Sequence, residues 1–240
     1  MNYDVIIVGA GPGGIFSAYE LTRLRPELRV AVFEAGHPLK NRKCPIDGVR
    51  VKSCIACKSC SIMSGFGGAG AFSDGKYNIT NDFGGTLYEY LGKAKALELM
   101  RYVDQINMAY GGEGTKLYST AGTSLKKTCM QHGLHLLDAS VRHLGTDINY
   151  IVLEHLYDHL KEQVEFHFDC PIDTVEKTDN GYRIYSGDKF FEGRKCVISA
   201  GRSGSKWMEK VCKDLHIKTN SNRVDIGAVS YTHLRAHETV

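Results

Sequence analysis

The chain has 240 residues and a formal net charge of +3, with 42% hydrophobic and 24% charged residues. These values are ordinary for a globular protein, and they exclude the strongly basic surface typical of nucleic-acid-binding domains, so we expect no nucleic-acid partner. Glycine is the exception, because the 26 glycines exceed the usual share of about 7%.

No apolar stretch reaches the length of about 18 residues that a membrane span needs, and residues 1–4 lack the positive charge of a secretory leader. We therefore expect a cytoplasmic protein without a membrane span. Its eight cysteines would then stay reduced. In a reducing compartment, clustered cysteines are more often metal ligands or redox thiols than disulfides.

The beginning of the chain predicts a β-α-β unit. Residues 3–8 form a continuous apolar, β-branched run typical of a buried strand. Residues 13–25 carry apolar side chains at helical spacing and end before Pro26, and residues 29–33 form a second strand. Two strands separated by one helix imply parallel pairing with a right-handed crossover.

The middle of the chain is less periodic. Residues 36–86 predict an ordered functional loop with short strands, because they hold four cysteines and a run dense in glycine. Apolar side chains at helical spacing predict helices over residues 87–110, 124–132 and 147–163. The first of these helices would end at Gly111, and Thr146 or Asp147 would cap the third.

The last third of the chain predicts strands. A buried strand is expected at 164–168, followed by a small antiparallel meander. The strands of the meander are predicted at residues 172–176, 182–185 and 189–192. A further buried strand, over 195–199, leads into a second glycine turn.

Glycines lie between the first strand and the first helix in the pattern Gly9-x-Gly11-x-x-Gly14, with Pro12 and Gly13 inside it. The first glycine allows a tight turn, the second lets a pyrophosphate approach the backbone, and the third permits close packing of helix on strand. Free amides and the positive end of the helix dipole then meet the phosphates. The pattern therefore predicts a dinucleotide site rather than a glycine turn that only packs.

Glu34 ends the second strand, 20 residues after Gly14. A carboxylate there can accept hydrogen bonds from ribose hydroxyls, and its charge repels the 2′-phosphate of NADP. The first glycine pattern does not separate NAD from FAD. The strand 195–199 followed by Ala200 and Gly201 resembles the place where two-dinucleotide-fold flavoproteins pass the cofactor again. This second element favours FAD, the alternative being a plain strand-to-helix turn.

Residues 65–75 hold five glycines, which bring backbone amides close to a flat ring or a phosphate because no Cβ intervenes. The residues of this loop predicted to bind the cofactor are Gly67, Gly68, Ala69, Gly70 and Ser73. The alternative is a flexible linker. Phe66 and Phe72 argue against a linker, which rarely carries aromatic side chains.

Three cysteines follow the spacing Cys54-x2-Cys57-x2-Cys60, and Cys44 lies upstream. Such spacing lets thiolates converge on a zinc ion or an iron–sulfur cluster, with Cys44 as the fourth ligand. Redox dithiols use the same spacing, here for electron exchange with a flavin. A metal site, a redox dithiol and free thiols are three alternatives that the spacing leaves open.

Several motifs together resemble a group of uncharacterised FAD-dependent dehydrogenases or oxidoreductases with the glutathione-reductase-type two-dinucleotide-binding fold. The matching segments are residues 5–14, 34, 67–76, 142–147 and 201–204. The resemblance implies bound FAD, redox chemistry and a place for residues 67–73 on the isoalloxazine side, with NAD(P)H as a candidate electron donor. It also implies that the C-terminal half of such proteins is absent from this chain.

The sequence thus predicts an α/β fold with a Rossmann-like FAD-binding domain, built from a parallel sheet with helices and a small antiparallel meander. Residues 1–85 and 145–228 are expected to form this domain, and residues 86–144 an inserted helical portion on the substrate side. Residues 229–240 resemble a translated sequencing adapter and are set aside. The chain would then be the N-terminal part of a longer protein.

The predicted function is that of an FAD-dependent oxidoreductase that exchanges hydride or electrons with a small-molecule substrate or a redox partner. One alternative is a flavin-dependent disulfide reductase that uses a CxxC dithiol. The other is an NAD-binding module without catalysis. The sequence identifies no general acid or base, no substrate and no oligomeric state.

Overall fold

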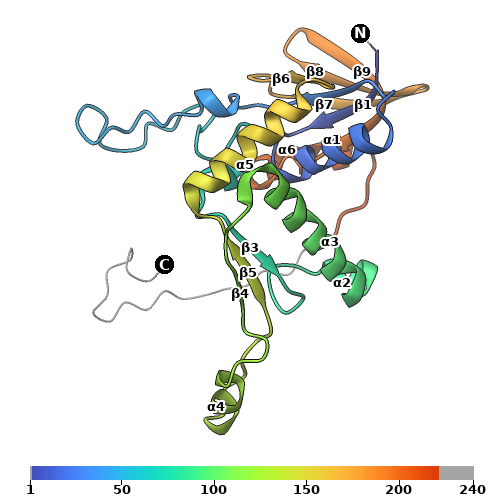
Figure 1. The fold of residues 1–240 in the computed structure, drawn as a ribbon. Coiled ribbons are helices and arrows are strands. Elements are labelled where there is room, and N and C mark those ends of the chain that lie inside the picture. Colours follow the sequence, from blue (N-terminus) through green and yellow to red (C-terminus); the bar gives the residue numbers. More distant parts are fainter. Residues whose placement is uncertain (1, 222–240) are drawn as a thin grey trace.

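The computed structural model describes residues 2–221. A six-stranded sheet of order β6-β2-β1-β9-β8-β7 forms the main body, and a three-stranded sheet of order β3-β5-β4 lies apart from it (Figure 1). The predicted α/β class, with a parallel sheet and an antiparallel meander, is confirmed. The predictions for residues 222–228 and 229–240 lie outside the described residues.

The predicted β-α-β unit is present at the N-terminus. Strand β1 (Asn2–Val8) pairs in parallel with β2 (Val30–Phe33), and β2 pairs in parallel with β6 (Val164–His167). Helix α1 (Pro12–Leu24) connects β1 to β2, as expected. The helix α5 (Gly145–Leu160) packs beside α1 on the same face of the sheet.

The apolar run of β1 has partners on both faces of the sheet. Val5 and Ile7 belong to a core shared with α1 and α5. Ile6 and Val8 belong to a second core that includes side chains of α6 (Ser205–Asp214) and of the meander. A strand covered on both faces needs apolar residues at every position, which is why the run does not alternate.

Strand β9 (Lys189–Ile198) joins the two halves of the main sheet. Its first half pairs antiparallel with β8 (Gly181–Ser186), and its second half pairs parallel with β1. Strand β8 pairs in turn with β7 (Thr174–Thr178). The two strands predicted at 189–192 and 195–199 are therefore one. They looked separate because Gly193 interrupts the side-chain pattern where a Cβ would lie 2.7 Å from Ile6 Cγ1.

The prediction of one helix over residues 87–110 is wrong. The chain forms α2 (Leu87–Leu91), α3 (Lys93–Asn107) and a wide helical turn, η3 (Met108–Gly112). Gly92 separates the first two helices with φ of 77°, in the left-handed region that favours glycine. Apolar spacing continues across this break, so periodicity alone did not show it.

The start of α5 also differs from the prediction. The helix begins at Gly145, its N-cap residue is Leu144, and no side chain caps it. Thr146 and Asp147 therefore lie inside the first turn, where the carboxylate of Asp147 still favours the positive helix end. Among the described residues, no helix has the length and apolar character needed to cross a membrane.

Residues 86–144 contain strands as well as helices. Strands β4 (Leu117–Ser119) and β5 (Ser140–His143) pair with each other, and β5 also pairs with β3 (Lys76–Ile79). Helix α4 (Leu125–Gln131) lies at the tip of the connection between β4 and β5 (Figure 1). Strands β4 and β5 were missed because they are only three and four residues long. The division of the chain at residues 86 and 144 stays a prediction.

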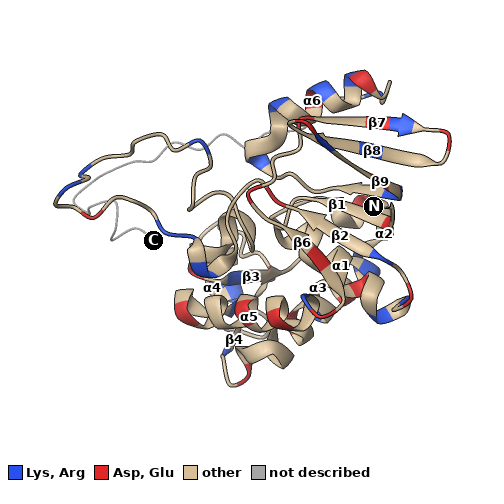
Figure 2. Ribbon diagram, turned by 90° about the horizontal axis from the view of Figure 1, so that it is seen from above, with Lys and Arg blue, Asp and Glu red and all other residues tan. Residues whose placement is uncertain are grey.

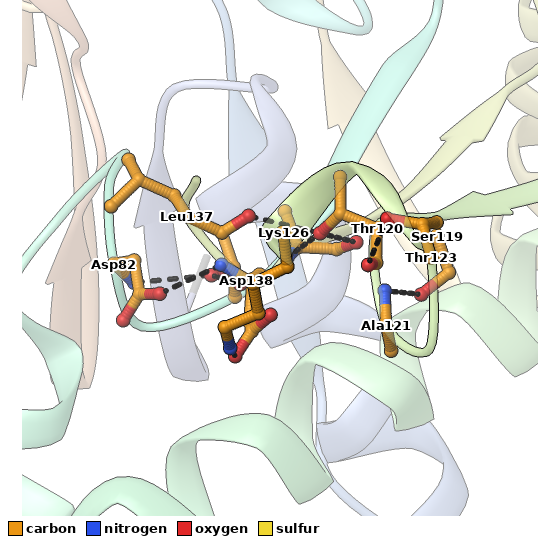
Figure 3. A network of polar contacts seen from close by, with 10 residues as sticks. Asp82, Ser119, Thr120, Ala121, Thr123, Lys126, Leu137 and Asp138 are labelled. Atoms are coloured by element: carbon orange, nitrogen blue, oxygen red, sulfur yellow. Dashed lines mark hydrogen bonds and ion pairs between the residues drawn. The ribbon is translucent and has the colours of Figure 1, made fainter. Parts of the chain in front are cut away.

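Polar contacts lie in the arm, defined here as residues 117–143, where strands β4 and β5 give way to the segment that holds α4 (Figure 3). Thr120 Oγ1 donates to the Leu137 carbonyl at 2.9 Å, and Lys126 Nζ lies 2.7 Å from Asp138 Oδ2. The Asp138 amide donates to Asp82 Oδ2 at 3.2 Å. Because α4 has no buried residue, these contacts and the backbone pairing of β4 with β5 hold the arm together.

Candidate functional site

Two adjoining cavities lie at the carboxyl ends of β1, β2 and β9. The glycine cavity, of about 380 Å³, is lined by the first glycine loop (residues 9–14), the second glycine loop (residues 65–75) and the turn after β9. The large cavity, of about 660 Å³, is lined by the end of β2, by α6 and by the segment that follows β6. It is also lined by the cysteine loop, the segment that holds Cys44, Cys54, Cys57 and Cys60. Gly9, Glu34, Ser64, Ala200 and Ser203 line both, so the cavities form one cleft. Open parallel sheets bind ligands at this edge.

The glycines of the first loop have different roles. Gly9 has φ of 102°, and a Cβ there would lie 2.4 Å from the Ser199 carbonyl oxygen. A Cβ at Gly14 would lie 1.9 Å from the Gly9 carbonyl oxygen. Both positions therefore need glycine for the fold itself. At Gly11 the nearest atom to a Cβ is Gly68 Cα at 3.9 Å, an ordinary van der Waals contact, so the fold itself does not require glycine there.

The N-terminus of α1 faces the glycine cavity. The helix begins at Pro12 without a side-chain cap, and Ile15 donates its amide to the Gly11 carbonyl at 2.9 Å. The amides before Ile15 have no acceptor within the helix, and the helix dipole makes this end attractive to an anion. Arg202, which also lines the cavity, adds a cationic side chain.

Glu34 is buried at the end of β2, with 7% exposure. Its Oε2 accepts the Ala10 amide at 2.7 Å, and its Oε1 accepts the amides of Gly36 at 2.8 Å and Gly65 at 2.9 Å. These three amides satisfy most of the buried charge. A carboxylate offers about four acceptor positions, so one position on Oε2 is left for a ligand hydroxyl.

The second glycine loop contacts the first. The Gly67 amide donates to the Ala10 carbonyl at 2.8 Å, and a Cβ at Gly68 would lie 3.1 Å from Gly11 Cα. Asn149 of α5 holds the loop from behind by donating to the Gly70 carbonyl at 3.0 Å. The loop is therefore an ordered wall of the site and not a flexible linker.

The structure brings most of the predicted cofactor residues together. Those that line the glycine cavity are Gly9, Gly11, Pro12, Gly13, Glu34, Gly68, Ala69, Gly70, Ala200 and Gly201. Gly14, Gly67 and Ser73 do not line this cavity. Gly14 packs α1 on β1, and Ser73 Oγ donates to the Gly70 carbonyl at 2.8 Å.

The four cysteines predicted as metal ligands are not gathered. Cys44, Cys54, Cys57 and Cys60 are free thiols in the light-blue loop that extends from the body in Figure 1. Within residues 2–221, no group of three or more His, Cys, Asp and Glu side chains is arranged to hold a metal ion. The loop is extended here, and the x2 spacing gathers thiolates only when the backbone turns around a common centre.

Sequence reasoning missed several residues of the large cavity. His37 follows β2 and Asp169 follows β6, and their side chains pair at 2.5 Å. Cys170 and Trp207 also line this cavity, as does Cys57, which the cysteine spacing had singled out. Strands β2 and β6 are parallel neighbours, so the segments after them end side by side. The sequence predicts both strands but not that they are neighbours, and that pairing is what places His37 beside Asp169.

Arg142, within one of the segments that carried the resemblance, lines neither cavity. Its guanidinium lies against Asp104 of α3, with Nε and Nη2 at 3.0 and 2.8 Å from the two carboxylate oxygens. Hydrogen bonding to Asp104 raises the pKa of Arg142. The residue therefore fastens β5 to α3.

No protein-family model matches the chain. Among solved structures, the chain is similar to a glycine oxidase from Geobacillus kaustophilus, with a TM-score of 0.51 and 15% identity, over 90% of this chain and 58% of that one. It also matches an L-α-glycerophosphate oxidase from Mycoplasma pneumoniae with FAD bound, with a TM-score of 0.48 and 15% identity, over 89% of this chain and 57% of that one.

A third similar structure is an L-amino acid deaminase from Proteus vulgaris, with a TM-score of 0.43 and 14% identity, over 90% of this chain and 50% of that one. The chain thus spans 58% of the glycine oxidase and about as much or less of the other two. At this level of identity, the similarity to the glycine oxidase shows the fold alone.

Proposed function

We propose that this chain binds FAD and forms part of a flavin-dependent oxidoreductase. The contact between the two glycine loops carries the proposal. The Gly67 amide bonds to the Ala10 carbonyl, and Gly11, which has no Cβ, lines the channel formed by the glycine cavity at the N-terminus of α1. A diphosphate fits such a channel, because backbone amides and a helix end meet it without a side chain in the way. The fold shared with a glycine oxidase supports an oxidoreductase.

The residues of the cleft divide the work of holding FAD. Gly11, Gly13 and Arg202 would hold the pyrophosphate, and the remaining acceptor position of Glu34 would bind a ribose hydroxyl of the adenosine. Residues 68–70 would lie toward the flavin ring. When bound, the flavin supplies hydride or electron transfer, while the chain orients it and excludes water.

The absorption spectrum of the purified protein tests this proposal. We expect a flavin spectrum and the release of FAD, not FMN, on denaturation. A colourless protein that binds neither FAD nor FMN but does bind NAD would contradict the proposal and support an NAD-binding module instead.

The variant Gly11→Ala tests FAD binding separately from the stability of the fold. Its new methyl group would enter the channel while meeting only Gly68 Cα, at 3.9 Å. We expect weaker FAD binding by about tenfold or more with an almost unchanged free energy of unfolding. Isothermal titration and urea unfolding measure the two quantities. Unchanged FAD affinity would count against a diphosphate beside Gly11.

A flavin-dependent disulfide reductase is the second candidate. One observation favours it: Cys57 is exposed and lines the large cavity, and Cys54 lies three residues before it. Thiol titration before and after reduction of the flavin, together with analysis for iron and zinc, tests this candidate. Two thiols gained on reduction would support it, whereas stoichiometric metal would contradict it.

A further inference from the structure

Arg42 is a buried cation that the sequence did not single out. Only 5% of the residue is exposed. Its Nε, Nη1 and Nη2 donate to three backbone carbonyls, those of Ser61 at 2.9 Å, Phe66 at 2.7 Å and Ile62 at 2.8 Å. The guanidinium carbon lies 4.9 Å from the centroid of the Phe72 ring. One side chain thus fixes both ends of the turn 61–66 and contacts the end of the second glycine loop.

The environment of Arg42 is unfavourable for a charge on its own. Burial lowers the pKa of Arg42, and the nearby charges of Glu34 and Cys60 act in the opposite direction. Burying a guanidinium carries a desolvation cost that only good hydrogen-bond geometry offsets. The planar fork of arginine meets three carbonyls at once, which the single ammonium of lysine cannot match.

The turn that Arg42 fixes supplies amides to the site. The Gly65 amide donates to Glu34, and the Gly67 amide donates to Ala10 in the first glycine loop. A Cβ at Gly65 would lie 2.6 Å from Arg42 Cδ, so the guanidinium stem packs directly on this turn. Arg42 itself lines neither the glycine cavity nor the large one. Its influence on a ligand must pass through the turn.

We propose that Arg42 is a positioning residue of the cofactor site, which sets the second glycine loop against the first. This inference rests on the proposed binding of FAD. Without the guanidinium, the turn 61–66 loses three donors, and the amides of Gly65 and Gly67 lose their fixed direction. The channel proposed for the pyrophosphate and the free acceptor position of Glu34 are then no longer held at a fixed distance and direction from each other.

The test uses Arg42→Ala and Arg42→Lys in the full chain, with FAD as the titrant. We expect FAD affinity to fall by about 10- to 100-fold in both variants, because Lys keeps the charge but not the fork. Millimolar methylguanidinium should restore most of the affinity of Arg42→Ala by filling the vacated space. Methylammonium should not. A purely structural defect would not distinguish these two cations.

Arg50→Ala is the matched control, since Arg50 is an exposed arginine of the same loop. It should bind FAD as the wild type does. Wild-type affinity in Arg42→Ala would overturn the inference about Arg42 while leaving FAD binding intact. Absence of FAD binding in the wild type would instead defeat the proposed function. Circular dichroism checks folding, and loss of the fold in both variants would also overturn a positioning role.

Discussion

Gly9 and Gly70 both belong to the predicted cofactor site, but the structure uses them differently. Gly9 has φ of 102° and touches the Ser199 backbone. Gly70 has no neighbour within 4 Å of a Cβ. The spacing of the first motif predicted the ligand loop and the packing of helix on strand at Gly14, but not the contact of Gly9 with Ser199. The dense glycines of the second loop did not reveal which positions the fold requires.

Gly9→Ala should therefore be the costly substitution. A left-handed backbone and a backbone clash together destabilise the fold by about 1 to 3 kcal/mol or more. Gly70→Ala should change the free energy of unfolding by less than about 0.5 kcal/mol. Urea unfolding of both variants measures the difference. Equal destabilisation would contradict the packing role of Gly9.

Cys196 of β9 makes stability depend on pH. Burial raises the pKa of its thiol from 9.0 to about 11. In the unfolded chain the thiol loses its proton at lower pH, so the stability that the neutral thiol contributes is present below about pH 9 and is lost as pH rises toward 11. Cys196→Ala should be less sensitive to pH between 8 and 10.5, by about 1 to 2 kcal/mol. Identical pH profiles for both proteins would refute this assignment.

At the scale of elements, the sequence predicted the β-α-β unit, α5 and the meander because each follows a local period. It failed at Gly92 and Gly193. Gly92 ends a helix inside continuous apolar spacing, and Gly193 continues a strand through an apparent break. The sequence does not distinguish a glycine that ends a helix from one that continues a strand, because the residues around it in space decide which role it has.

The pair of Arg142 and Asp104 fastens β5 to α3, with side-chain exposures of 13% and 11%. Asp104→Ala leaves a nearly buried guanidinium without its carboxylate and should cost about 3 kcal/mol. Adding Arg142→Met should recover part of this loss. Asp138→Ala, which breaks the exposed pair with Lys126 in Figure 3, should cost less than about 1 kcal/mol. Urea unfolding compares the three, and equal costs would contradict the argument.

For the whole molecule, the site was more predictable than its surroundings. Motif spacing predicted the first loop and Glu34, because short-range geometry at strand ends dictates these residues. The turn at Ala200 was predicted from its resemblance to a flavoprotein element. The partners His37 and Asp169 required the parallel order of β2 and β6. The cysteine spacing was compatible with several chemistries, and the described chain forms no metal cluster from it.

The cysteine loop should be the first place that a protease cuts. Figure 2 shows Lys and Arg along this loop, which extends from the body. Asp47 accepts amides from its own turn, so local contacts hold the tip. Trypsin should first cleave after Arg50 or Lys52, and then in the arm at Lys126 or Lys127. Mass spectrometry identifies the cuts.

FAD should slow cleavage after Lys58 more than after Arg50, because Lys58 lines the large cavity. A ratio of the two cleavage rates that FAD leaves unchanged would argue against ligand in this cavity. First cleavage within α1, at Arg23, would contradict the assignment of the loop as the least protected segment.

The dual pairing of β9 bears on how this protein can be recombined with others. One uninterrupted stretch of backbone serves two sheet partners, and Gly193 pairs with both Tyr3 and Tyr182. In a chimaera spliced within residues 189–198, one half of β9 would come from another protein. The residue that replaces Gly193 would then lie against Ile6, where a Cβ does not fit. A crossover point belongs in the exposed turn at Asn180, which joins β7 to β8, because a splice there leaves β9 and both of its pairings uncut.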